Sequence, residues 1–139
     1  MTTVAQLLAA GRLEPVPPDP EAARLRLARA DQHLLTAASL LGQDNEVAYG
    51  SLCDAARKAI TAHMLAHGLR AGAAQGAHTA VGIYALEAIP DPSRSVLEFQ
   101  RMRRRRNKSE YDDMVIGNQD VATDLEHAKN IVESVKASL

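Results

Sequence analysis

The chain has 139 residues, of which 46% are hydrophobic and 3% aromatic, and its formal net charge is −1. A chain of this length can bury one core, and the scarcity of β-branched and aromatic alternation favours packed helices over a sheet. The single cysteine excludes an internal disulfide and a cysteine-based zinc site, and the small net charge excludes a polycation.

The N-terminal segment, residues 1–19, predicts a short helix followed by a proline-rich connector. Thr2 or Thr3 can cap the helix and Gly11 can end it, after which Pro15, Pro17 and Pro18 favour an extended chain. No basic start precedes an apolar stretch of signal-peptide length, and no run approaches the ~18 apolar residues of a membrane span. We therefore expect a cytoplasmic protein that does not contact a membrane.

Two longer helices are expected next. Asp19 is placed to cap the first, with proline in its opening turn, and apolar residues recur at helical spacing until Gly42. Asp44 can cap the second, which we expect to continue to about Gly68 with a stripe of small buried residues. A glycine-rich loop, residues 68–76, follows it.

The C-terminal half predicts three more helices. The first covers residues 77–89 and stops before Pro90, and the second begins near Ser93 and enters a run of arginines. The last begins after Gly117, with Asn118 or Asp120 as its cap. Short links between amphipathic helices are typical of an antiparallel bundle, so we predict an all-α bundle of four to five main helices in one domain, residues 1–139.

The arginine run is the most unusual feature of the sequence. Residues 101–108 read RMRRRRNK, and the charge reverses over residues 110–113, which read EYDD. Arginine is suited to planar, bidentate contact with phosphate or carboxylate. At ~100° per residue, one side of a helix here would present four residues, with Tyr111 at its edge: Arg103, Arg106, Asn107 and Glu110.

This grouping could hold a phosphodiester. Arginine would supply charge, Asn107 would orient the group, and Tyr111 would handle a proton or stack on a base. The remaining cations would extend the basic surface: Arg101, Arg104, Arg105 and Lys108. The same run is also typical of a solvated helix face paired with nearby carboxylates, and this interpretation stays open.

Three stretches together resemble prokaryotic HEPN-domain proteins. They are residues 49–70, with the run DAARKAITA that begins at Asp54, then GAH ending at His78, and RRRRNKSEYD beginning at Arg103. Their order and spacing extend over about 100 residues. The resemblance implies a HEPN-like bundle that forms a homodimer in which the Arg-Asn segments of both copies face a shared cleft.

The resemblance also implies a function. Many HEPN proteins are metal-independent ribonucleases, often toxins of toxin–antitoxin or defence systems, with a motif of Arg, four to six residues, then His. Arg106 and Asn107 match the Arg-Asn pair, but Tyr111 falls at the histidine position, and no histidine lies between Lys108 and Leu125.

Metal-free RNA cleavage requires a base, an acid and cations around the phosphorane. Because a phenol is protonated at neutral pH, Tyr111 suits the role of acid better than that of base. His78 could supply the base if the fold brings it close. No metal or cofactor is expected, and the paired His63 and His67 lack an identifiable third ligand.

Two hypotheses follow from these observations. In the first, the protein binds RNA or another phosphate-bearing ligand, with ribonuclease activity carried by Arg103, Arg106, Asn107 and Tyr111 and controlled by an antitoxin or nucleotidyltransferase partner. In the second, it is a non-catalytic helical interaction module whose arginines contact a second copy or an acidic partner. The first hypothesis is defeated if the wild type shows neither RNA cleavage nor salt-sensitive RNA binding.

Overall fold

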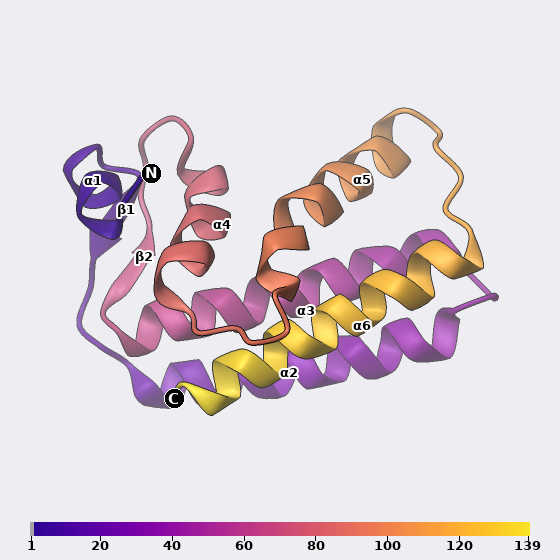
Figure 1. The fold of residues 1–139 in the computed structure, drawn as a ribbon, viewed down its shortest axis with the longest axis horizontal. Helices are drawn as coiled ribbons and strands as arrows, with labels where there is room; N and C mark the ends of the chain where they lie inside the picture. Colours follow the sequence, from indigo (N-terminus) through magenta and orange to yellow (C-terminus); the bar gives the residue numbers. More distant parts are fainter. Residues whose placement is uncertain (1) are drawn as a thin grey trace.

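The computed structural model describes residues 2–139, so Met1, part of the predicted first helix, lies outside it. Three long helices lie side by side in the lower part of Figure 1. They are α2 (Pro20–Leu40), α3 (Asn45–Ala66) and α6 (Asn118–Ala137). Helix α2 runs opposite to both others, whereas α3 and α6 run in the same direction. The predicted all-helical character is confirmed for most of the chain.

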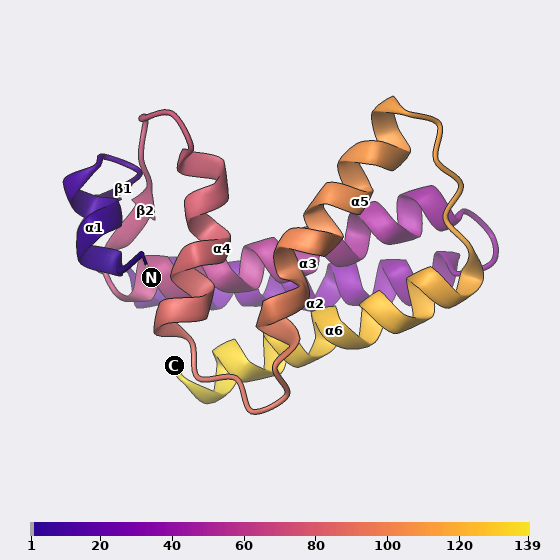
Figure 2. The same ribbon diagram turned by 45° about the horizontal axis from the view of Figure 1, so that its top comes forward.

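Two further helices stand on this layer and pack against α3. They are α4 (Ala77–Ala88) and α5 (Phe99–Tyr111), which the 3-10 helix η1 (Ser95–Glu98) precedes. Both rise from the same side of the layer and diverge from each other, as Figure 2 shows. The α5 helix therefore has a long face that no other helix covers.

A small two-stranded sheet was not predicted. Strand β1 (Leu13–Pro15) pairs antiparallel with β2 (Leu69–Ala71), and Leu13 lies opposite Ala71. The sheet replaces part of the expected connector and loop, and it holds α1 (Val4–Ala9) at one end of the molecule. Gly72 permits this pairing, because a Cβ there would lie 2.1 Å from the carbonyl oxygen of Gly11.

Capping residues set the predicted starts of the long helices. Asp19 accepts a hydrogen bond from the Ala22 amide at 3.0 Å, and Asp44 accepts one from Val47 at 3.2 Å. The start of α6 differs from the prediction, because Gly117 is the N-cap and Asp120 reaches back to accept from its amide at 3.2 Å.

The core gathers around α3, whose buried residues are mainly small. Their size lets the neighbouring helices approach closely, and Tyr49 and Tyr84 fill the larger spaces. Among residues 2–139, no helix combines the length and apolar character that crossing a membrane requires.

Candidate nucleic-acid interface

Helix α5 carries the arginine run and is oriented by the side chains it buries. Phe99, Met102 and Ser109 are buried on its inner side, and the Cys53 thiol of α3 contacts the Met102 carbonyl oxygen at 3.7 Å. Burial raises the pKa of Cys53 to about 12, so this thiol is not a reactive nucleophile. The helix therefore presents a fixed outer side.

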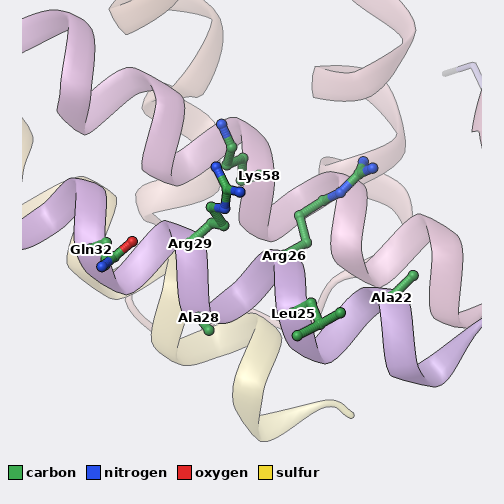
Figure 3. A pocket seen from close by; sticks show the side chains of 7 residues that line it. All are labelled: Ala22, Leu25, Arg26, Ala28, Arg29, Gln32 and Lys58. Carbon is green, nitrogen blue, oxygen red and sulfur yellow. The ribbon is translucent and has the colours of Figure 1, made fainter.

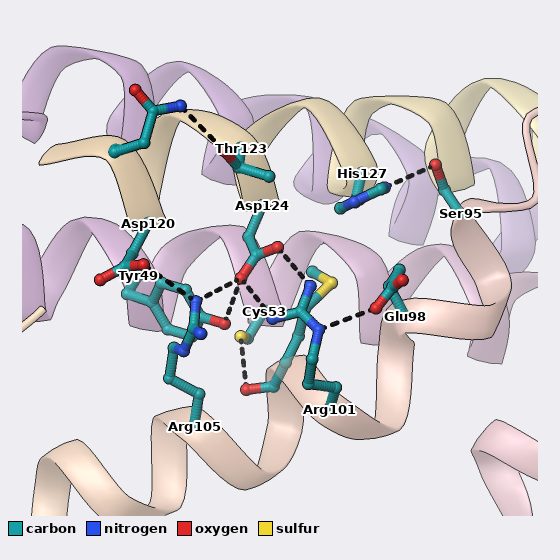
Figure 4. A network of polar contacts seen from close by, with 12 residues as sticks. Tyr49, Cys53, Ser95, Glu98, Arg101, Arg105, Asp120, Thr123, Asp124 and His127 are labelled. Atoms are coloured by element: carbon teal, nitrogen blue, oxygen red, sulfur yellow. Dashed lines mark hydrogen bonds and ion pairs between the residues drawn. The ribbon is translucent and has the colours of Figure 1, made fainter. Parts of the chain in front are cut away.

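Two of the arginines bind a buried carboxylate. Asp124 of α6 is fully buried, and Arg101 donates to its two oxygens at 2.7 and 3.1 Å. Arg105 donates to Asp124 at 3.2 Å, and the Tyr49 hydroxyl donates to it at 2.7 Å, as Figure 4 shows. This network joins α3, α5 and α6.

The network is ionised and structural. Burial would raise the pKa of Asp124, but hydrogen bonds from Arg101 and Tyr49 outweigh that effect and lower it. The pKa of Tyr49 is raised, first by burial and then by its hydrogen bond to Asp124. Arg101 also binds Glu98 at 2.7 Å, so Arg101 and Arg105 face carboxylates of this chain.

Arg106 is engaged on the side toward α3. Its Nη1 donates to Asp54 at 2.6 Å and its Nε lies 3.5 Å from Glu110. Burial would raise the pKa of Asp54, but its hydrogen bond from Arg106 outweighs that effect and lowers it. A shallow hollow of about 230 Å³ surrounds the pair, and Glu46 also lines it. Because Asp54 and Glu110 both contact the Arg106 guanidinium, an incoming anion would have to displace a carboxylate from it.

The outer side of α5 is different. Four exposed residues follow one another at positions i, i+3, i+4 and i+7: Arg104, Asn107, Lys108 and Tyr111. We call them the α5 stripe. Tyr111 is 80% exposed, and within residues 2–139 the four side chains have no hydrogen bond or ion pair to another group. The stripe thus combines two available cations, an amide and an aromatic ring.

Arg103 lies between the inner and outer sides. Its Nε donates to Gln100 at 3.0 Å, and Gln100 donates to the Thr79 carbonyl oxygen of α4 at 3.0 Å. Arg103 is half-buried and faces a neutral amide rather than a carboxylate. It keeps its charge available beside the stripe.

The structure therefore divides the residues that the sequence grouped together. Arg106 points toward α3, whereas Asn107 and Tyr111 lie on the exposed stripe. His78 is exposed in the first turn of α4, near the sheet, and the last turn of α5 lies well apart from it in both views. Within one chain, His78 is not a neighbour of Tyr111.

Sequence reasoning missed the two acidic partners, Asp124 and Asp54. Asp124 lies between Val121 and Leu125 on the apolar stripe of α6, and a carboxylate at such a position indicates a buried partner. The position of Asp124 on an apolar stripe could be read from the sequence, but the arginines that pair with it could not.

The two histidines at the end of α3, His63 and His67, make hydrogen bonds to other groups of the protein. His63 Nδ1 lies 2.6 Å from the Tyr84 hydroxyl, and His67 Nδ1 lies 2.8 Å from the His63 carbonyl oxygen. In the part of the chain that the structure describes, no three His, Cys, Asp or Glu side chains gather as a metal site.

No family model, curated protein or solved structure matches this chain.

Proposed function

We propose that this protein binds single-stranded RNA through the α5 stripe. The observation that carries the proposal is the exposure of Arg104, Asn107, Lys108 and Tyr111 on one uncovered helix face, without partners among residues 2–139. The resemblance to HEPN-domain proteins supports the same class of ligand.

The chemistry of the stripe suits an unpaired strand. Arg104 and Lys108 can each neutralise a backbone phosphate, since no carboxylate of the described chain binds them. Tyr111 offers an open ring on which an unstacked base can lie, and the Asn107 amide can hydrogen-bond to a base edge or the 2′-hydroxyl. Bases in a duplex are not available for such stacking, which favours single strands.

The inner half of the arginine run supports the stripe without contacting RNA. Arg101 and Arg105 bind Asp124, and Arg106 binds Asp54, so these three hold α5 in one orientation. RNA cleavage would be a further property of this surface. If Tyr111 serves as the acid of such a reaction, the base comes from a second copy or from the substrate, since His78 lies elsewhere in this chain.

The test measures binding of a fluorescent twelve-nucleotide oligouridine by anisotropy at several salt concentrations. For the Arg104→Gln/Lys108→Gln variant we expect weaker binding and a log K against log[salt] slope smaller by roughly 1.4, about 0.7 for each lost phosphate contact. Tyr111→Ala should weaken the free energy of RNA binding by about 1–3 kcal/mol. Tyr111→Phe should weaken it much less, because phenylalanine keeps the aromatic ring.

The matched control is Arg24→Gln/Lys129→Gln. These two exposed cations pair with Glu21 and Glu126, and their loss changes the net charge equally. If the control lowers affinity as much as the stripe variant, or if the wild type shows no salt-sensitive binding, the proposal is rejected. Electrophoresis of the same RNA after incubation reports cleavage separately.

A second candidate is a non-catalytic interaction module. It is favoured by the internal pairing of Arg101, Arg105 and Arg106, which marks much of the run as structural. In that case the stripe contacts protein, and the stripe variant should lose self-association or partner binding while RNA binding is absent from the outset.

A further inference from the structure

A second cationic surface lies on the opposite side of α3 from the long helix α6, in a groove between α2 and α3. We call it the α2–α3 groove, defined by Arg26 and Arg29 of α2 and Lys58 of α3, with Leu25 and Gln32 at its edge. It is an open hollow of about 700 Å³ on the surface of the two helices. It shares no residue with the α5 stripe.

The three cations line the groove, and no carboxylate is among its lining residues. In Figure 3, Arg29 extends from α2 toward Lys58 on α3, whereas Arg26 projects from α2 away from that pair, farther along the groove. None of the three has an ion pair or a side-chain hydrogen bond within residues 2–139. Arg101, Arg105 and Arg106, in contrast, each bind at least one carboxylate.

The pKa of a nearby histidine, His33, is affected by the positive charge of the groove. The Nε2 atom of His33 is buried and has no hydrogen-bond partner in the described chain. The pKa of His33 is lowered, first by burial and next by the charge of Lys58, with further contributions from Arg29 and Arg57 that Asp54 opposes. The charge of Lys58 and Arg29 therefore reaches this histidine, although burial is the larger cause of its lowered pKa.

Helix packing keeps these charges together. The inner faces of α2 and α3 meet through fully buried small residues such as Ala30 and Ala59, which fix the backbone positions of the three cations. Like charges held in one groove repel one another, and an anion bound among them removes that repulsion. Two guanidinium groups and an ammonium match the oxygen atoms of phosphate groups.

We propose that the α2–α3 groove binds the phosphate groups of a polyphosphate or of a nucleic-acid backbone. The two ligands share the chemistry that Arg26, Arg29 and Lys58 recognise, and the exposed Leu25 and Gln32 leave space for the rest of either ligand. The proposal is independent of the α5 stripe, because different residues carry it.

The experiment compares the wild type with the Arg26→Gln/Arg29→Gln/Lys58→Gln variant. Inorganic tripolyphosphate is titrated by calorimetry, and the twelve-nucleotide oligouridine is titrated by anisotropy. The matched control is Arg24→Gln/Arg70→Gln/Lys129→Gln, which removes three cations that pair with exposed carboxylates elsewhere. The groove variant should keep its melting temperature, since it loses like-charge repulsion rather than packing.

We expect at least a tenfold loss of affinity for tripolyphosphate, oligouridine or both in the groove variant, and less than a twofold change in the control. Loss for tripolyphosphate identifies a polyphosphate site, and loss for oligouridine alone identifies a backbone site. The proposal is overturned if neither probe distinguishes the groove variant from the control by this margin. The Arg104→Gln/Lys108→Gln variant, measured with the same two probes, shows separately how much the α5 stripe contributes to binding.

Discussion

Asp124 is the residue on which the orientation of α5 depends. Its buried carboxylate accepts hydrogen bonds from Arg101, Arg105 and Tyr49, which offset the cost of removing its charge from water. Removing one partner from such a cluster leaves the other groups with unmatched charge. The resulting loss in free energy of unfolding is larger than the stability that the intact cluster contributes.

We expect Asp124→Asn to lower the free energy of unfolding by on the order of 3 kcal/mol, as measured by urea denaturation. Asp120→Asn is the control, because Asp120 is 41% exposed and lies 3.4 Å from Arg105, and asparagine keeps an oxygen that can accept from the Gly117 amide. This substitution should therefore cost less than about 1 kcal/mol. Equal effects from the two substitutions would show that the buried network does not have this role.

His63 makes stability depend on pH. Burial, and then the charge of His67, lower its pKa from 6.5 to about 4. Between these values the unfolded chain binds a proton that the folded chain does not, so stability is complete above pH 6.5 and falls as the pH drops toward 4.

Urea denaturation at pH 7 and pH 5 should therefore differ by roughly 1–2 kcal/mol through His63 alone. The His63→Gln variant should lose that part of the difference while keeping the part due to other groups. An unchanged pH dependence in the variant would contradict the assignment to His63.

For single residues, the sequence indicated that the arginines would pair with anions, but it did not identify which carboxylates they contact. The Arg101–Asp124 and Arg106–Asp54 pairs join residues 23 and 52 positions apart, and no local pattern specifies such a contact. Helical spacing grouped Arg106 with Asn107, but spacing alone does not say which side of α5 faces the layer.

Among the elements, α4 and α5 are held at a close approach through Gly82. A Cβ on Gly82 would lie 2.2 Å from Nε2 and 2.9 Å from Cγ of Gln100, so this side chain would have to leave the Thr79 carbonyl oxygen. Gly50 of α3 is also within a helix, but a Cβ there would lie no closer than 3.7 Å to Arg106.

The same substitution should therefore have opposite effects at the two positions. We expect Gly82→Ala to lower the melting temperature, with a loss of about 1–2 kcal/mol from overpacking. Gly50→Ala should raise stability by roughly 0.5–1 kcal/mol, because alanine suits a helix interior better. Thermal denaturation of both variants checks this, and a stabilising Gly82→Ala would contradict the close approach.

Helix ends were predictable where a capping residue lies close to them in the sequence. Asp19 and Asp44 cap α2 and α3 as expected, and Gly42 adopts a φ of 82° just beyond the end of α2. The strands of three residues were not predictable, since they are too short for a periodic pattern, and Leu13 pairs with Ala71 far along the chain.

At the scale of the whole molecule, the homodimer expected from the HEPN resemblance remains a prediction. Sedimentation velocity should give twice the 14.9 kDa of one chain. If the α5 stripe binds RNA, Arg104→Gln/Lys108→Gln should leave that mass unchanged, whereas in the interaction-module hypothesis it should release monomers. A wild-type monomer would contradict the expected dimer itself.

The small net charge conceals a strongly uneven distribution. The α5 stripe and the α2–α3 groove each present cations without carboxylate partners, while the buried Asp124 and the half-buried Asp54 pair with other arginines. Composition alone suggested no attraction to polyanions. Only the fold shows which charges are cancelled within the chain.

The concealed carboxylate of α6 also has a consequence for redesign. Because Asp124 anchors the helix from within, the outward positions 104, 107, 108 and 111 carry none of that anchoring. They can be rewritten without disturbing the scaffold beneath, so one framework could be given new ligand preferences by changing four side chains.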